Sequence, residues 1–160
     1  MHKTLGILVY SMLAMVCLFT ACSDDDDLVA PGHVDNPAAI RYDLPESFCL
    51  SSVEDHKAII VRTSEEFNKL FAKENFVVSH LDVTLPPIDF NKYDLFYAQG
   101  NTSTVIGDLH ADMETNSYPY RLWVYVKMTM LPSVDRWSVG YLVQKDDWND
   151  QVTLDLVIID

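Results

Sequence analysis

Residues 120–130 read Tyr-Arg-Leu-Trp-Val-Tyr-Val-Lys-Met-Thr-Met, with an apolar residue at every second position. The apolar series consists of Leu122, Val124, Val126, Met128 and Met130. The alternate positions carry Arg121, Trp123, Tyr125 and Lys127. Because successive side chains of a β-strand point to opposite faces, this pattern predicts a strand with one packed face and one partly solvated face.

Four further segments of the C-terminal part are rich in aromatic and β-branched residues, which favours strands at 93–98, 104–114, 137–145 and 152–159. Turn signals separate the five segments at 99–101, 116–117, 131–133 and 146–150. Alternating strands with short connections predict an antiparallel sheet.

One helix is predicted ahead of this sheet. Residues 58–61 form a short β-branched run, and the Thr63-Ser64-Glu65-Glu66 sequence that follows is a capping box. Apolar residues then recur at helical spacing, at Phe67, Leu70 and Phe71. The expected fold is therefore α+β, with one main helix packed on a mostly antiparallel sheet, in a single small domain over residues 46–160.

The first 21 residues have the pattern of a secretory signal peptide, with a basic start, an apolar run over 5–21 and small residues before Cys22. Thr20-Ala21-Cys22 resembles a bacterial lipobox, which implies that Cys22 is lipidated and becomes the new N-terminus. A transmembrane helix is the alternative, but spanning a bilayer takes about 20 residues, and this run lacks basic stop-transfer residues.

Ser23 and the aspartates that follow it, Asp24, Asp25, Asp26 and Asp27, resemble the export signal of Bacteroidota surface lipoproteins. This resemblance implies a lipid-anchored protein of the outer membrane that faces the cell exterior. A solvated linker or a calcium-collecting run is the alternative interpretation. Pro31-Gly32, Asn36-Pro37 and Leu44-Pro45 follow without periodicity, so residues 22–45 are expected to form a tether.

The charge and the cysteine content restrict the classes of partner and of covalent crosslink that the chain can have. Removal of residues 1–21 leaves 160 − 21 = 139 residues. Their side chains carry a net charge of 10 − 24 = −14. Such an acidic chain lacks the basic stripe that nucleic acid requires, which excludes that class of partner. Cys49 is then the one cysteine besides Cys22, so no intramolecular disulfide is expected. We interpret Cys49 as a small buried apolar residue rather than a nucleophile.

Residues 55–160 also resemble a known family. The pattern consists of the Thr63-Ser64-Glu65-Glu66-Phe67 helix, an Ile88-Asp89-Phe90 turn before a strand, and a last hairpin that carries Lys145. It resembles the C-terminal domain of PrcB-like protease-complex accessory proteins. The resemblance implies an accessory or binding protein and brings no catalytic residue with it.

The sequence contains no G-x-S-x-G, H-E-x-x-H, P-loop or G-x-G-x-x-G motif. Asp108, His110 and Asp112 alternate along one predicted strand and are the candidate metal ligands. The alternative is the polar solvent face of a half-buried strand. The acidic segment 146–150 is either a calcium loop or an acidic turn, and it lacks the glycine and glutamate of an EF-hand.

We therefore expect a surface-anchored, non-catalytic binding or accessory module that uses no cofactor. Its partner would be an envelope protein, a host protein or a glycan. The candidate binding residues are Trp123, Tyr125 and Trp148, because exposed aromatic side chains anchor interfaces. The alternative is a small metal-dependent enzyme or metal-binding protein built on the Asp108, His110 and Asp112 strand.

Overall fold

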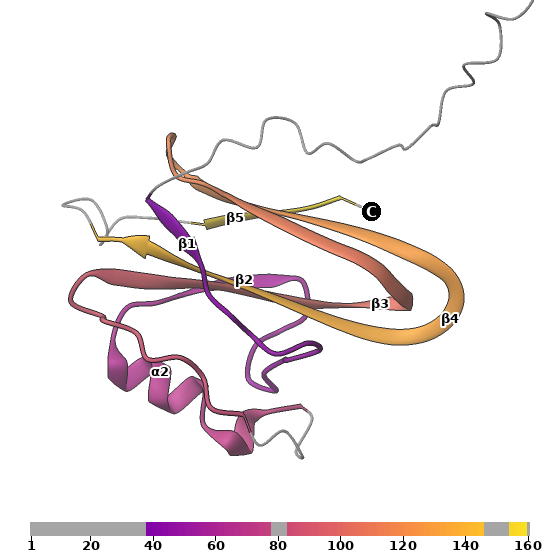
Figure 1. Cartoon of the computed structure of the whole chain (residues 1–160), viewed down its shortest axis with the longest axis horizontal. Coiled ribbons are helices and arrows are strands. Elements are labelled where there is room, and N and C mark those ends of the chain that lie inside the picture. Colours follow the sequence, from indigo (N-terminus) through magenta and orange to yellow (C-terminus); the bar gives the residue numbers. More distant parts are fainter. Residues whose placement is uncertain (1–37, 78–82, 146–153, 160) are drawn as a thin grey trace, which may run out of the picture. The chain divides into compact units, whose positions relative to one another are not determined.

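The computed structural model describes residues 38–77, 83–145 and 154–159, all within one compact unit. Figure 1 shows its elements in chain order: β1 (Ala39–Arg41), β2 (Lys57–Val61), α2 (Ser64–Leu70), the 3₁₀ helix η1 (Lys73–Asn75), β3 (Tyr93–Glu114), β4 (Tyr120–Gln144) and β5 (Leu154–Ile159). The predicted signal peptide, Cys22, the Ser23–Asp27 run, the acidic segment 146–150 and Trp148 lie outside the described residues.

A long antiparallel hairpin of β3 and β4 dominates the fold. The two strands have 22 and 25 residues and pair from Tyr93↔Gln144 to Glu114↔Arg121. The turns predicted at 99–101 and 131–133 are therefore wrong, because both segments lie inside continuous strands. The ladder is instead irregular between residues 102 and 108, where β4 residues 128–134 face the shorter β3 segment 103–107. Bulges of this kind bend a strand pair.

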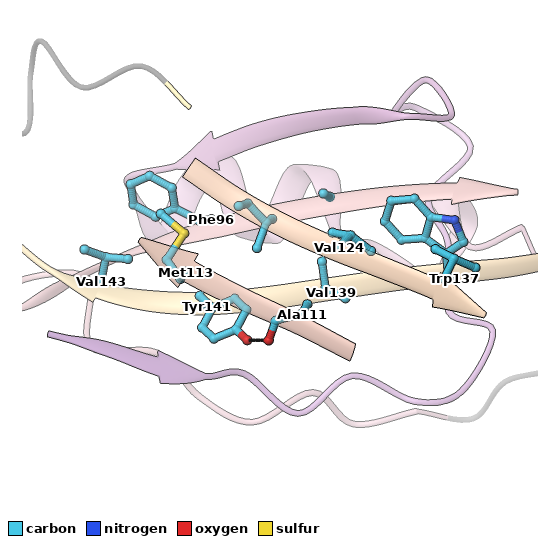
Figure 2. Packing of buried hydrophobic residues seen from close by; sticks show 11 residues of the cluster. Phe96, Ala111, Met113, Val124, Trp137, Val139, Tyr141 and Val143 are labelled. Carbon is cyan, nitrogen blue, oxygen red and sulfur yellow. Dashed lines mark hydrogen bonds between the residues drawn. The ribbon is translucent and has the colours of Figure 1, made fainter. Parts of the chain in front are cut away.

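The bend folds the hairpin back over itself (Figure 1), so that both strands contribute to a core between the two halves. Every buried member of this core comes from β3 or β4: Phe96, Ala98, Ala111, Met113, Leu122, Val124, Val126, Trp137, Val139, Tyr141 and Val143. Figure 2 shows how one contact joins the halves, with the Tyr141 hydroxyl donating to the Ala111 carbonyl oxygen. The hairpin therefore covers its own apolar face.

The remaining strands extend this ribbon into a curled half-barrel. The ladder order is β1-β4-β3-β2, with antiparallel pairing throughout this path. β5 pairs in parallel with the other half of β4, at Tyr120–Tyr125. Residues 137–145 and 152–159 were expected to form a hairpin, and this is wrong because β5 pairs with 120–125 instead.

The predicted α+β class is wrong. Strands make up 56% and helix 10% of the described residues, and α2 has seven residues with none buried. The predicted capping box of the helix is confirmed, because the Thr63 hydroxyl accepts from the Glu66 amide at 3.1 Å. Glu66 reaches back to the Arg62 amide, at 2.9 Å. The larger core is supplied by the hairpin itself, while the predicted apolar face of the helix, Phe67, Leu70 and Phe71, packs against a second core.

A second, smaller core lies between the other face of β2–β3 and the segment that follows β1. Its buried members are Tyr42, Phe48, Leu50, Val53, Val61, Phe71, Phe76, Leu95 and Tyr97. The Tyr42 hydroxyl donates to the Pro86 carbonyl oxygen at 2.7 Å. The tether expected up to residue 45 thus overlaps folded structure, because β1 pairs with β4 and Tyr42 is buried.

The alternation in 120–130 holds for only part of the predicted face. Leu122, Val124 and Val126 are at most 2% exposed, as the pattern predicts. Met128 and Met130 are 44% and 99% exposed. The reason is the bulged corner, which interrupts the regular pairing beyond Lys127.

Buried Gln99 ties the segment around residue 50 to the sheet. Its Nε2 donates to the carbonyl oxygens of Leu50 and Val53, at 3.0 and 2.7 Å. Its Oε1 accepts from the Leu50 amide and from the Tyr97 hydroxyl, both at 2.7 Å. All four hydrogen-bonding positions of this amide are filled, in a side chain that is 1% exposed.

We predict that Gln99→Leu lowers the free energy of unfolding by about 3 kcal/mol, because it leaves several buried polar groups without their partner. The exposed Gln144 of β4 provides a matched control, and Gln144→Leu should change stability by less than about 0.5 kcal/mol. Urea denaturation of the two variants measures the difference. Equal midpoints would show that Gln99 does not hold this segment.

Candidate functional site

The predicted site residues that the structure describes lie on one face of the hairpin. Asp108, His110 and Asp112 of β3 pair in register with Lys127, Tyr125 and Trp123 of β4. Their neighbours on both strands, such as Ala111 and Val124, are buried in the core on the other face. The candidate ligands therefore lie beside Trp123 and Tyr125, on the face of the hairpin opposite its core.

Polar groups on this surface bond to one another. The Trp123 indole donates to Glu114 Oε2 at 3.1 Å, and the Ser117 hydroxyl donates to Glu114 Oε1 at the same distance. His110 Nε2 lies 3.1 Å from Asp112 Oδ2, and the His110 ring centroid lies 5.9 Å from that of Tyr125. Cross-strand pairs of this kind stabilise a sheet, which gives the surface a structural role.

The described residues contain no group of three or more His, Cys, Asp or Glu side chains that could hold a metal ion. His110 and Asp112 are close together, whereas zinc sites use three or four protein ligands. Asp108 lies opposite Lys127 in the ladder, further along the strand. The geometry therefore gives no support to the alternative of a metal site at Asp108, His110 and Asp112.

The predicted aromatic anchors are less accessible than expected. Tyr125 is 9% exposed, and Trp123 is half-buried and hydrogen-bonded. Two further C-terminal aromatics, Trp137 and Tyr141, are both core residues. The fold-over of the hairpin makes room for them, and local sequence patterns carry no signal for such a fold-over.

Lys145, which belongs to the family-like pattern, takes part in an ion cluster around the buried Asp94. Its Nζ lies 3.1 Å from Oδ1 of Asp94, a carboxylate whose side chain is 3% exposed. The same ammonium group donates to the Arg62 carbonyl oxygen at 3.1 Å, and Arg62 Nε lies 3.8 Å from Asp94 Oδ2. The cluster links the start of β3, the end of β4 and the start of α2.

Sequence reasoning missed a groove that runs along β2 and α2. Its cavity volume is about 570 Å³. It is lined by Ser52, Val53, Glu54, Lys57, Ala58, Ile59, Ile60, Glu66, Lys69 and Leu70. The β-branched run at 58–61 predicted a strand. No local sequence pattern indicated that this strand would be the last in the order β1-β4-β3-β2 and would border a groove.

The groove combines an apolar floor with a charged rim. Both cores reach the surface here, since Ala58 and Ile60 pack against the hairpin core while Ile59 and Leu70 pack against the smaller core. The rim carries two acids, Glu54 and Glu66, and two bases, Lys57 and Lys69. The rim is thus locally neutral in a chain with a net charge of −13.

Cys49 behaves as the sequence predicts. It is 1% exposed, and its thiol donates to the Trp137 carbonyl oxygen at 3.5 Å. Burial raises the pKa of the thiol to about 11, against a smaller lowering by the Arg136 charge. At neutral pH the thiol is therefore protonated, and a protonated thiol is a poor nucleophile.

None of the helices in the described part of the chain is both long enough and apolar enough to cross a membrane.

We predict that Cys49 of the folded protein resists maleimide at pH 8, because the thiolate fraction is small and the side chain is buried. In 6 M guanidinium the same cysteine should react within minutes. Mass spectrometry of the peptide that contains Cys49 measures both states. Rapid labelling of the folded protein would return Cys49 to the candidate nucleophiles.

No protein-family model, curated protein or solved structure matches this chain. The resemblance of residues 55–160 to PrcB-like accessory domains therefore stays a prediction from the sequence pattern.

Proposed function

We propose that this protein is a surface lipoprotein whose globular domain binds a partner and performs no catalysis. The observation that carries the proposal is the groove along β2 and α2, with its apolar floor and locally neutral rim. Its partner would be an envelope protein, a host protein or a glycan, and the features of the groove favour an extended protein segment.

The strand at the groove supports an extended partner. β2 pairs with β3 and is the last strand of the ladder path. β5 comes near β2, yet its described ladder is with β4. An edge strand offers backbone amide and carbonyl groups that an added strand can use. A partner segment in β conformation could therefore extend the sheet at this edge.

The side chains of the groove would add affinity to this backbone pairing. Ala58, Ile59, Ile60 and Leu70 are all half-buried, so part of their apolar surface remains for a partner to cover. Covering this apolar surface would favour binding, and the lost freedom of the two molecules would offset part of the gain. The rim adds a local charge of zero, so an acidic or a basic segment meets no single-sign repulsion there.

The N-terminal sequence supports the proposed location of this binding, the cell surface. The lipobox-like Thr20-Ala21-Cys22 and the acidic run Ser23–Asp27 are typical of a lipid-anchored protein exported to the cell surface. One acyl chain gives only weak membrane binding, whereas two or more hold a protein on the membrane. The proposed location is therefore the outer membrane, with the domain facing outward.

We predict that the mature chain begins at an acylated Cys22. Mass spectrometry of the N-terminal peptide should show the acyl mass, and Cys22→Ser should release the protein from the membrane fraction or leave it unprocessed. Cys49→Ser is the matched control and should keep the anchor. An unmodified Cys22 behind an intact residue 1 would contradict the lipoprotein proposal.

We predict that a photo-crosslinking amino acid at Lys57 or Lys69 captures a partner protein on intact cells. Both side chains are exposed on the groove rim, so the substitution should leave the fold intact. Lys92 is an exposed control away from the lining of the groove, and its side chain is 71% exposed. A discrete heavier band from positions 57 and 69, absent at 92, is the expected result.

A second variant tests whether the groove itself binds. Lys69→Glu in the Lys57 crosslinker background makes the rim acidic. The crosslinked band should change several-fold if the partner segment lies along α2, downward for an acidic segment and upward for a basic one. Crosslinking at 92 as strong as at 57 and 69 would overturn the groove as the binding site. A band that survives every rim substitution would do the same.

A further inference from the structure

The groove has two walls that a very short connection joins. One wall is β2, which ends at Val61, and the other is α2, which begins at Ser64. Arg62 and Thr63 alone lie between them, so the backbone of this pair sets the angle between the walls. The width of the groove therefore depends on what holds this connection in place.

Apolar packing alone does not fix the tilt of α2. None of its seven residues is buried. Phe67 and Leu70 pack against the smaller core, and the Phe67 ring stacks on that of Phe71 with the centroids 4.6 Å apart. The hydrophobic effect is non-directional, so these contacts keep the helix on the core without setting its tilt. Directional polar contacts are needed for that.

Polar side chains from outside α2 hold both ends of the helix. At the connection, the Lys145 ammonium group donates to the Arg62 carbonyl oxygen at 3.1 Å. At the far end, Asn75 Nδ2 donates to the carbonyl oxygens of Lys69 and Leu70, at 2.8 and 3.1 Å. The last carbonyl groups of a helix lack partners inside it, and Asn75 supplies them here.

Buried Asp94 keeps Lys145 in the position from which it reaches this connection. Lys145 Nζ lies 3.1 Å from Asp94 Oδ1, and Arg62 Nε lies 3.8 Å from Asp94 Oδ2. The Asp94 side chain is 3% exposed, and a carboxylate so deeply buried is stable only beside cations. Asp94 directly precedes Leu95, which pairs with Val61 of β2. Both cations are therefore held against the pair of strands that forms the first wall.

We propose that Lys145, held by Asp94, is a positioning residue that sets the angle between β2 and α2 and thereby the affinity of the groove for an extended protein segment. The effect on affinity rests on the proposed function, whereas the effect on the angle does not. Neither Lys145 nor Asp94 lines the groove, so both act through α2 and not by contact with a partner.

The position of the helix matters because α2 supplies part of the lining, namely Glu66, Lys69 and Leu70. A wall that is already in place need not be ordered when a partner binds, which lowers the entropic cost of association. Glu66 also accepts from the Arg62 amide at 2.9 Å, so a movement at the connection moves this rim carboxylate as well. Loss of the Lys145 contact should thus weaken binding without removing any side chain of the groove.

The angle can be tested without a partner, through the lysines of the groove rim. Lys57 of β2 and Lys69 of α2 are both exposed, so a short amine-reactive crosslinker of fixed length reports the separation of the walls. The crosslink between Lys69 and Lys73 of η1, both on the helical side, is the internal reference. In the full chain, Lys145→Met should lower the ratio of the 57–69 crosslink to the 69–73 crosslink several-fold, measured by mass spectrometry.

Three further variants make this test specific. Lys145→Arg should restore the ratio, because a guanidinium group can also pair with Asp94 and donate to a carbonyl oxygen. Lys92→Met is the matched control and should leave the ratio unchanged, since the Lys92 side chain is 71% exposed and pairs with Asp89. The double variant Asp94→Asn with Lys145→Met removes the buried charge together with its partner, so it should fold and lower the ratio as the single variant does.

Partner capture then tests the effect on affinity. With the photo-crosslinker at position 57, Lys145→Met should weaken the heavier band on intact cells several-fold. Lys145→Arg and Lys92→Met should leave this band unchanged. A wild-type chain that captures no partner would contradict the proposed function, while the ratio of lysine crosslinks would still report the angle.

An unchanged ratio in the folded Lys145→Met and double variants would overturn the inference, since the ion cluster would then only stabilise the fold. Loss of the folded state in both variants, seen by circular dichroism, would assign the cluster to folding and overturn the inference as well. A ratio that falls while the captured band stays the same would refute the link between the angle and the affinity.

Discussion

The fold depends on one constraint: a two-stranded ribbon with a long apolar face cannot leave that face in water. β3 and β4 are each more than 20 residues long, and the ribbon meets the constraint by folding over at its bulges. Close packing next to the bend also depends on Gly100, where a Cβ atom would lie 2.5 Å from Trp137 Cζ2 and 2.4 Å from His56 Cδ2. The proline of β4, Pro132, lies within the same bulged segment, where no regular ladder needs its missing amide hydrogen.

The fold-over leaves two surfaces unused by folding. The hairpin supplies its own core, and a groove remains between β2 and α2. The corner must accommodate more β4 than β3 residues, and its surplus side chains have no core to enter. The groove and the exposed corner therefore follow from the same geometry, although they lie on different elements.

Local features of this fold were predictable from the sequence, and its long-range pairing was not. The strand predicted at the β-branched run 58–61, the Thr63 cap and the burial of Leu122, Val124 and Val126 each depend on neighbours within a few residues, and all are confirmed. The continuity of β3 through Gly100 and of β4 through Pro132 depends on pairing over tens of residues, and there the turn signals misled. The α+β assignment failed for the same reason, since it gave the helix a covering role that the second half of the hairpin fills.

The candidate site was also only partly predictable from the sequence. Alternation correctly placed Asp108, His110 and Asp112 on one face, but it could not show that Trp123 and Tyr125 lie directly opposite them. Once paired, the indole of Trp123 binds Glu114 and the His110 ring packs near Tyr125, so the face that looked chemically richest stabilises the hairpin. Functional surfaces are better sought where folding leaves polar edges or apolar side chains unused. In this chain, those places are the groove along β2, which includes none of the predicted site residues, and the corner at Met130, which the alternation had placed in the core.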